Sequence, residues 1–392
     1  MMFALKGLQK MGVDKILGYV LKDPDKNLPK LAEWIDKFAG DSFDSQKRQV
    51  MDAITNKNNI YNGLLLRLLK STDKDVMKSL LLNFFMNEHV QGAERRKVLR
   101  TKYDCNSPLV IMLELIERAG TDSNEELADL SKLPFNMADR IVNQGKELGT
   151  YVYILSGYEP LIRKNDIFRL CEKHRDCVFL CFTDGAYIDL NFADEMLRVK
   201  NFVPFISFDG NKEQMDNFHG EGSFEKAINA MVLLRKKRLL FGISCCYTKK
   251  SFEHTISKEH YERMMETGAS FVNFHYLELN RDWISDELLD LEESENIREQ
   301  LRKFRAEKPL FALNFQNSSK DLKACLGGGR KYLHISAQGE ITPCEYRRES
   351  GLKIQNCDLR EALCSEEFGI YKEDKSLKDY GQCLCPLNRL KP

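Results

Sequence analysis

Cysteine is the residue type with the most chemical potential in this chain, which holds twelve among 392 residues. Six cysteines lie in helix or strand patterns, where a free thiol is most often a small buried side chain: Cys171, Cys177, Cys181, Cys245, Cys246 and Cys364. The candidates for a metal site are Cys325, Cys344 and Cys385 in predicted turns, with Cys383 or Cys357 as a fourth thiolate. Four thiolates suit an iron–sulfur cluster or zinc, and unliganded thiols are the third alternative.

A second set of polar residues follows predicted strands. Between residues 105 and 315, apolar runs alternate with helical patterns, which predicts parallel βα units. The predicted strands are 110–113, 151–155, 178–183, 203–208, 239–246 and 271–276. His275 lies near the end of the last strand, where it would contact a substrate or else be a satisfied core residue. His219 follows the fourth strand.

Residues 1–104 are predicted to be helical, because their apolar positions are periodic and strand signals are few. One predicted face carries Leu31, Trp34, Ile35 and Phe38, and another carries Leu64, Leu65, Leu68 and Leu69. We expect this layer to cover the barrel or to make a contact between copies of the chain, as in a homo-oligomer.

The composition gives no indication of a nucleic-acid or membrane partner. Lys+Arg and Asp+Glu both number 59, so no excess of basic residues indicates nucleic-acid binding. No apolar run reaches the length of about 18 residues that a membrane helix needs, and no secretory signal accompanies the cysteines. We therefore expect a soluble cytoplasmic protein with reduced or metal-bound thiols.

Several segments together resemble the radical S-adenosylmethionine (radical SAM) superfamily. Residues 144–160 resemble a helix, the second strand and the SAM-binding loop, which reads Gly-Gly-Glu-Pro in the family and Gly157-Tyr158-Glu159-Pro160 here. Residues 182–189, 206–210 and 242–248 resemble the third, fourth and fifth strands in order and spacing. Residues 325–335, Gly339, 343–344 and 385–387 resemble the SPASM/twitch-like C-terminal extension of the family.

This resemblance implies an α/β fold with a partial (β/α)6 barrel, an N-terminal helical layer and a small cysteine-containing extension. The implied regions are 1–104, 105–315 and 316–392. The positions that correspond to the SAM pocket are Gly157, Glu159, Thr183, Asp184, Ser207, Asp209 and His275. Their alternative role is to cap strands and turns. Cys325, Cys344 and Cys385 match cysteines that hold an auxiliary [4Fe-4S] cluster in the extension.

The chain departs from the family where the catalytic cluster belongs. Family members place C-x3-C-x2-C after the first strand, because three thiolates hold a [4Fe-4S] cluster and leave one iron open for SAM. Counting on from the first strand puts Ala119, Ser123 and Glu126 at these positions. We expect residues 114–120 to form a short helix and 122–126 a solvated turn. Tyr158 is a second departure, because glycine in the family lets the loop pass close to SAM.

Two functions of different classes follow. The first is a pseudoenzyme that lacks the ligands of the core cluster and binds a small molecule or a protein partner, with SAM binding in doubt. The second is an iron–sulfur, SAM-dependent radical enzyme that acts on a peptide or small molecule. The missing cysteines favour the first, whereas Glu159, Asp209 and the C-terminal cysteines keep the second open.

Overall fold

The computed structural model describes residues 12–38, 51–117, 131–276, 289, 291–313, 326–345, 350–369 and 371–372. Within these residues a single sheet has the strand order β10-β9-β1-β3-β4-β5-β6-β7-β8, with β2 paired to β1. The central strands β1, β3, β4, β5, β6, β7 and β8 are parallel neighbours, and β8 and β10 form the two edges of the sheet. The mostly parallel, open α/β barrel agrees with the predicted fold class.

The strands begin and end close to the predicted positions. Their bounds are β1 Val110–Glu117, β2 Ser131–Lys132, β3 Val152–Gly157, β4 Val178–Thr183, β5 Phe202–Ser207, β6 Gly242–Tyr247, β7 Phe271–Tyr276 and β8 Phe311–Leu313. One prediction is wrong: residues 114–117, expected in a helix, continue β1. They pair with β3 and β2, and Leu115 and Ile116 are buried, so sheet pairing and core packing outweigh helix propensity there. Residues 118–130 lie outside the described segments.

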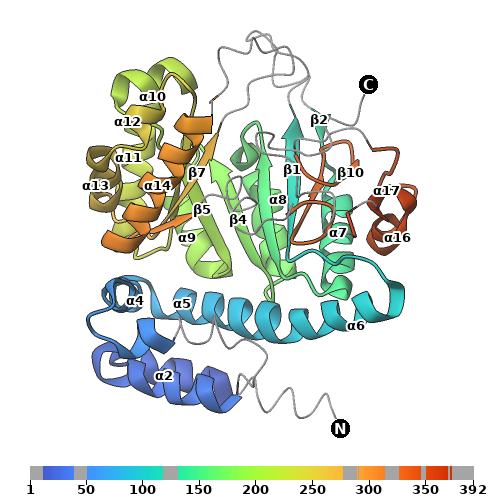
Figure 1. Ribbon diagram of the computed structural model, residues 1–392, viewed down its shortest axis with the longest axis horizontal. Coiled ribbons are helices and arrows are strands. Elements are labelled where there is room, and N and C mark those ends of the chain that lie inside the picture. Colours follow the sequence, from blue (N-terminus) through green and yellow to red (C-terminus); the bar gives the residue numbers. More distant parts are fainter. Residues whose placement is uncertain are drawn as a thin grey trace.

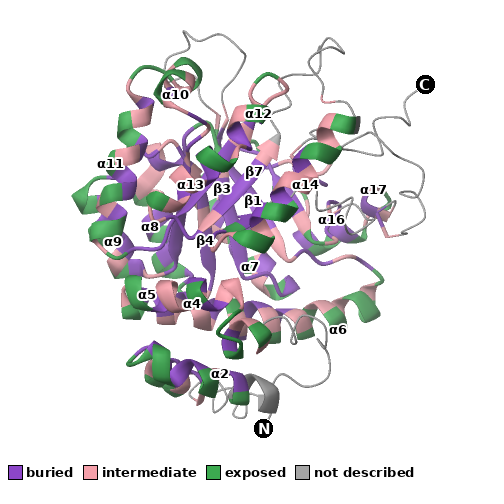
Figure 2. Cartoon of the chain, turned by 60° about the vertical axis from the view of Figure 1, so that its left-hand side comes forward, coloured by how far each residue is buried: buried purple, intermediate pink, exposed green. Residues whose placement is uncertain are grey.

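Helices cover the outer face of the sheet (Figure 1). They are α7 Phe135–Leu148, α8 Lys164–Lys173, α9 Leu190–Val199, α10 Lys212–His219, α11 Ser223–Lys236, α12 Phe252–Thr255, α13 Lys258–Glu266 and α14 Leu291–Glu307. Figure 2 shows that buried residues concentrate in the strands and on the inward helix faces, as a sheet covered by amphipathic helices requires. No helix in the described segments is long and apolar enough to cross a bilayer.

The N-terminal layer is helical, as its periodicity predicts. It contains α2 Pro24–Phe38, α4 Ile60–Ser71, α5 Lys74–Leu81, the π-helix η2 Leu82–Gly92 and α6 Ala93–Tyr103. Elements α5, η2 and α6 follow one another without a break and run beneath the amino ends of the strands (Figure 1). Leu64 and Leu69 are buried. The side chains of Trp34, Ile35 and Phe38 lie outside the described part of the chain.

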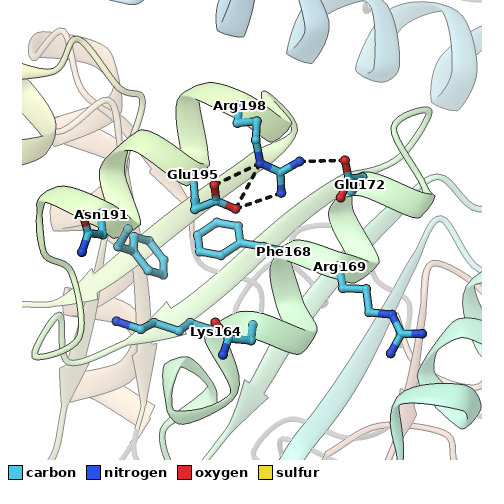
Figure 3. Close-up of a pocket in the computed structure, with 9 residues that line it drawn as sticks. Lys164, Phe168, Arg169, Glu172, Asn191, Glu195 and Arg198 are labelled. Atoms are coloured by element: carbon cyan, nitrogen blue, oxygen red, sulfur yellow. Dashed lines mark hydrogen bonds and ion pairs between the residues drawn. The ribbon is translucent and has the colours of Figure 1, made fainter.

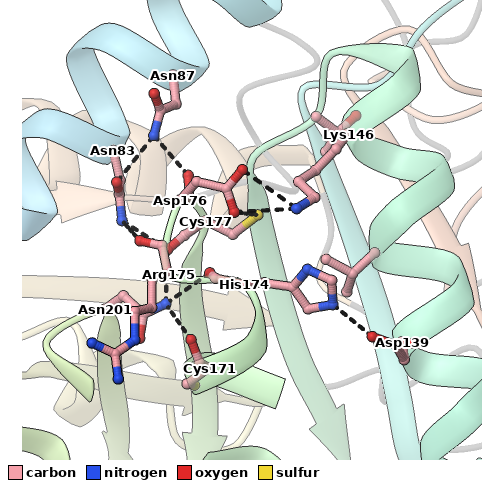
Figure 4. Close-up of polar contacts among 12 residues, drawn as sticks. Asn83, Asn87, Asp139, Lys146, Cys171, His174, Arg175, Asp176, Cys177 and Asn201 are labelled. Atoms are coloured by element: carbon pink, nitrogen blue, oxygen red, sulfur yellow. Dashed lines mark hydrogen bonds and ion pairs between the residues drawn. The ribbon is translucent and has the colours of Figure 1, made fainter. Parts of the chain in front are cut away.

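Asparagine side chains dock this layer onto the barrel (Figure 4). Asn83 Nδ2 donates to the carbonyl oxygens of Arg175 at 2.8 Å and Cys177 at 3.0 Å, and Asn87 Nδ2 donates to that of Asp176 at 2.8 Å. These carbonyls belong to the turn between α8 and β4. The amides therefore satisfy backbone acceptors that would otherwise be buried without partners.

The C-terminal region contributes to the same sheet. Strand β9 (Tyr332–Ile335) pairs in parallel with β1, and β10 (Ile341–Thr342) pairs antiparallel with β9. The short helices α16 (Leu359–Cys364) and α17 (Glu366–Gly369) follow, and α16 packs against α7 (Figure 1). Part of the region 316–392 is therefore continuous with the barrel sheet.

Candidate functional site

The turn after β3 carries a buried carboxylate. Glu159 is 5% exposed and caps the 3-10 helix η4 (Pro160–Arg163), whose Leu161 N–H donates to Glu159 Oε1 at 2.8 Å. Thr183 Oγ1 lies 3.0 Å from both oxygens of Glu159, and the Asp184 N–H donates to Oε2 at 2.9 Å. Residues from the carboxyl ends of β3 and β4 thus meet at one buried group, as the parallel strands predict.

Burial controls the protonation of this carboxyl group. Desolvation, followed by the nearby Asp184 carboxylate, raises the pKa of Glu159 to about 8. The backbone N–H groups of Asp184 and Leu161 act in the opposite direction, because they stabilise the charged form. The net result is a carboxyl group that gains or loses its proton near neutral pH at the rim of the barrel.

Gly157 and Tyr158 precede this carboxylate. Gly157 has φ +120°, and a Cβ there would collide with the carbonyl oxygen of Ile116 in β1. The Tyr158 N–H donates to that same oxygen at 3.0 Å. The Tyr158 side chain is 55% exposed, so the aromatic ring extends into solvent on the rim. The close approach of backbones therefore occurs at Gly157, and the residue after it accommodates a large side chain.

The ends of β5 and β6 are joined through Asp209. Its Oδ1 accepts from the Cys246 N–H at 2.5 Å, and its Oδ2 lies 2.6 Å from His219 Nε2. The hydroxyl of Thr255 donates to the Asp209 carbonyl at 3.1 Å. Ser207, at the end of β5, is half-buried and lies opposite Ser244 of β6 in the parallel register.

His275 lies in β7 beside this group. It is half-buried, and its ring centroid is 6.4 Å from that of Phe182 in β4. Burial lowers the pKa of His275, whereas the negative charge of Asp209 raises it. His275 lies opposite Cys246 in the parallel register, and the Cys246 N–H donates to Asp209, which places His275 beside this group. The structure therefore brings six of the seven candidate SAM-pocket residues into two clusters, Glu159/Thr183/Asp184 after β3 and β4 and Asp209/His275 with Ser207 nearby, while Gly157 shapes the first.

Two histidines add to this arrangement. His219 was a weak candidate from its place after the fourth strand, and its contact with the Asp209 carboxylate was not predicted. His260, from α13, stacks on Phe208 with ring centroids 5.4 Å apart, and its Nε2 lies 3.1 Å from the Phe208 carbonyl oxygen. Burial lowers the pKa of His260 to about 4. His260 lies in a polar helical segment of the sequence. Nothing in that segment indicated that its side chain would pack beneath the loop after the fourth predicted strand.

Two of the candidate metal ligands, Cys344 and Cys357, lie among the described residues. Cys325, Cys383 and Cys385 lie outside the described residues. Cys344 follows β10, is half-buried, and its carbonyl oxygen accepts from Thr342 Oγ1 at 3.2 Å. Across the described ranges, no three His, Cys, Asp or Glu side chains gather as a metal site. The auxiliary cluster and zinc thus both stay predictions.

The positions of the core-cluster cysteines, Ala119, Ser123 and Glu126, also lie outside the described residues. Cys105 precedes β1 and is buried at the amino end of that strand. The eight residues of β1 span about 26 Å at 3.3 Å per residue. Cys105 therefore lies at the opposite end of the sheet from the segment that follows β1.

The packing role predicted for six cysteines holds for most of them. Cys171, Cys177, Cys181 and Cys245 are buried, and burial raises the pKa of each of these thiols. Cys364 is exposed, so the packing prediction is wrong for this residue. It is the last residue of the short helix α16, where one face remains in solvent.

A surface hollow lies on the outside of the barrel between α8 and α9 (Figure 3). Phe168 contributes to its lining, and Arg198 spans it, with ion pairs to Glu172 at 2.7 Å and Glu195 at 2.8 Å. The guanidinium group is thus already neutralised by side chains of the same two helices. The hollow is separate from the residues at the carboxyl ends of the strands.

Comparison with known proteins identifies the fold. No family model matches the sequence, and no curated protein matches it either. Among solved structures, SuiB of Streptococcus suis bound to S-adenosylmethionine aligns with TM-score 0.57 and 17% identity over 79% of this chain and 82% of SuiB. SuiB bound to precursor peptide SuiA gives 0.56 and 18%, over 72% and 71% of the two chains. Native anSMEcpe with bound AdoMet and Cp18Cys peptide gives 0.51 and 16%, over 67% and 82%. The chain has the fold of radical SAM enzymes.

Proposed function

We propose that this chain uses a radical SAM fold to bind a ligand or a protein partner and does not cleave SAM reductively. The observation that carries the proposal is the composition of the segment after β1: residues 118–130 contain no cysteine. Reductive cleavage needs a cluster iron with an open position, and Ala119, Ser123 and Glu126 do not supply three thiolates. The donor set at these positions does not fit the cluster.

The geometry of the described cysteines supports the same proposal. Cys105 lies at the amino end of β1, about 26 Å from the start of the cluster segment by the length of the strand. Cys181 and Cys245 are buried within strands β4 and β6. Neither cysteine could serve as a replacement ligand for the segment after β1 unless a core strand moved.

The polar groups at the carboxyl ends of the strands form the proposed binding surface. Glu159 and Asp209 already hold hydrogen-bonding partners within the chain, which orders the rim without a ligand. Tyr158 and Tyr187 are exposed beside Glu159 and Asp184. Aromatic rings next to oriented polar groups suit contacts with a nucleoside, a peptide or a protein side chain.

The solved neighbours favour a peptide or a small molecule as the bound species. SuiB has been solved with a precursor peptide and with S-adenosylmethionine, and anSMEcpe with a peptide and AdoMet. We further propose that the cysteines at 325, 344, 383 and 385 hold an auxiliary [4Fe-4S] cluster, with zinc as the alternative. The cysteine-rich composition supports residence in a reducing cytoplasm.

The alternative function is an iron–sulfur, SAM-dependent radical enzyme. Its specific support is the retention of Glu159, Thr183 and Asp209 at positions that correspond to the SAM pocket of the family. A thiolate source outside the segment 118–130 would be needed to complete its core cluster.

One experiment separates these functions. Protein purified and reconstituted anaerobically with iron and sulfide is incubated with SAM and a strong reductant, and 5′-deoxyadenosine is measured. We expect no 5′-deoxyadenosine, and its formation in catalytic amounts would overturn the proposal. Iron, sulfide and zinc are measured in the same samples, with a Cys325, Cys344 and Cys385 to Ala variant as control. About four irons per chain, lost in that variant, would identify the auxiliary cluster, and zinc lost in that variant would identify the alternative.

A further inference from the structure

Two cysteines from distant parts of the sequence lie together at the side of the barrel. Cys105 lies five residues before the start of β1, and Cys364 ends α16. Their side chains are neighbours in the fold, although 258 residues separate them in the sequence. Neither residue is among the candidate metal ligands, and the proposed function uses neither.

Contacts on both sides of the pair hold the two segments in place. The Arg360 guanidinium lies 5.2 Å from the ring centroid of Tyr103, and Lys372 Nζ lies 3.5 Å from Asp104 Oδ2. Asn106 Nδ2 donates to the carbonyl oxygen of Tyr371 at 3.1 Å. Residues 103, 104 and 106 therefore contact the same C-terminal segment on either side of Cys105.

A glycine between the segments confirms how close they are. A Cβ at Gly329 would contact the side chains of both Leu363 and Asn106. Leu363 precedes Cys364, and Asn106 follows Cys105. The neighbours of both cysteines thus meet around one residue, Gly329.

The two thiols differ in their access to solvent. Cys364 is exposed, whereas Cys105 is 2% exposed. Burial, followed by the neighbouring Cys364, raises the pKa of Cys105 to about 12. A dissolved oxidant therefore reaches Cys364 first, and Cys105 is shielded from direct reaction. This is the arrangement of an attacking thiol with a second thiol beside it that resolves the mixed disulfide.

We propose that Cys105 and Cys364 are a redox-active pair that closes a reversible disulfide by exchange with a small-molecule disulfide. In the first step the Cys364 thiolate attacks one sulfur of the small disulfide and releases one thiol. Cys105 then attacks the Cys364 sulfur, its proton passes to the departing small thiolate, and the second small thiol is released. Two protein thiols are oxidised and one small disulfide is reduced to two thiols, so electrons and protons balance.

The disulfide would fasten the C-terminal segment to the start of β1. Helix α16 already packs on α7, and the Leu359 N–H donates to Gln144 Oε1 at 3.1 Å. A disulfide at Cys364 would add a covalent, reducible connection at the other end of α16. Oxidation would therefore restrict opening of residues 359–372 away from the barrel, and reduction would release that restriction.

The test is oxidation of the full chain with glutathione disulfide, followed by alkylation of free thiols and peptide mapping by mass spectrometry. We expect a Cys105–Cys364 linked peptide that dithiothreitol removes, and slower amide hydrogen exchange in residues 359–369 of the oxidised protein. Peptide mapping is required because other cysteines of the chain can oxidise as well. A matched control is Cys357→Ser, which changes a half-buried cysteine of the same region and should keep the linked peptide.

Cys364→Ser provides the decisive variant, because the exposed position tolerates the change. In this variant the linked peptide should be absent, and hydrogen exchange in residues 359–369 should not respond to glutathione disulfide. Three outcomes would overturn the proposal: Cys105 alkylated after oxidation of the wild type, Cys364 trapped only as its mixed disulfide with glutathione, or Cys105 linked to a cysteine other than Cys364.

Discussion

The hydroxyl group of Thr183 lies 3.0 Å from both carboxylate oxygens of Glu159, which joins the end of β4 to the turn after β3. This contact places a buried carboxyl group at the rim of the barrel, where no cationic side chain of the described segments pairs with it. Its neighbours are hydroxyl and N–H donors and the carboxylate of Asp184. The charge of Glu159 is therefore the property of the rim that responds most directly to pH.

Stability should fall as the pH rises through the titration range of Glu159. The folded pKa is about 8, above the ordinary value of 4.5, so the folded state holds a proton that the unfolded state has released between these values. The free energy of unfolding then decreases with pH by up to about 1.4 kcal/mol per pH unit. Glu159→Gln should remove this decrease in urea unfolding measured from pH 5 to pH 9.

A second variant tests the cause of the shift. Asp184→Asn removes the neighbouring negative charge, so the folded pKa of Glu159 should move downward. The loss of stability should still begin near the unfolded pKa but should end at lower pH and be smaller in total. The decrease in the free energy of unfolding with rising pH should persist in Asp184→Asn and vanish in Glu159→Gln. An unchanged pH profile in Glu159→Gln would show that other groups control the dependence.

Gly157→Ala should destabilise the chain through the turn after β3. The backbone at Gly157 has φ +120°, and the added Cβ would meet the carbonyl oxygen of Ile116 in the neighbouring strand. A strained backbone of this kind costs on the order of 1–3 kcal/mol, and the collision adds to it. Urea unfolding measures the change. Gly220→Ala is the control, because its φ is also positive, at +94°, but the space around its Cβ is open.

If strain in the backbone were the whole cause, the two glycine variants would lose equal stability. We expect Gly157→Ala to lose more, since only there does the new methyl group meet a strand of the sheet. Equal losses would contradict the proposed close approach of Gly157 to β1.

The sequence predicted the order and type of the barrel elements because each parallel strand is a short apolar run between helical patterns. Predicted strands 178–183 and 271–276 coincide with β4 and β7. Residues 114–117 were wrongly expected in a helix, since their mixed Glu and Leu pattern reads as helical, and pairing with both β2 and β3 decides otherwise. A local sequence pattern carries no information about this pairing between strands that are distant in the sequence.

The candidate site, like the fold, was predicted only in part. Glu159 and Asp209 were found from their places after predicted strands, and the structure puts them at the carboxyl ends of the sheet. Their partners were harder to predict: the pairing of Asp209 with His219 depends on how helix α10, which ends at His219, folds back toward the end of β5. The contact between Cys105 and Cys364 depends on how the C-terminal helices pack on α7. Contacts between distant segments of this kind require the tertiary structure.

His260 should contribute to the loss of stability at acidic pH, which we call the acid limb of the plot of stability against pH. Its folded pKa is about 4, below the ordinary 6.5, because burial disfavours the charged ring. Stability from the neutral ring is present above pH 6.5 and is lost as the pH falls from 6.5 toward 4, since the unfolded chain takes up the proton first. His260→Gln should flatten this limb. In wild-type protein, NMR signals of the His260 ring should stay constant from pH 8 to pH 5.5.

His254→Gln is the matched control for this prediction, because its ring lies 6.0 Å from that of His260. It should leave the acid limb largely in place. A His260 ring that titrates near pH 6.5 would contradict the burial argument.

The ion pair between Arg96 of α6 and Glu88 of η2 lies within the N-terminal layer, and both side chains also bind backbone groups of the barrel just before β3. Arg96 Nη1 lies 2.6 Å from Glu88 Oε1, and the two side chains are 11% and 0% exposed. Glu88 Oε2 also accepts from the Tyr151 N–H, at 2.8 Å, at the start of β3. Loss of one partner leaves a buried charge unpaired, which costs about 3–5 kcal/mol.

Arg96→Met should therefore lower the free energy of urea unfolding by several times more than Arg95→Ala. Arg95 is an exposed neighbour whose Nη1 donates to the Lys146 carbonyl oxygen at 2.6 Å. The double variant Arg96→Met/Glu88→Gln should recover part of the loss, because the unpaired carboxylate is gone while the amide can still interact with the Tyr151 N–H. Equal losses in the single and double variants would show that Arg96 acts through its contacts with backbone carbonyls, among them that of Gly149, and not through the charge of Glu88.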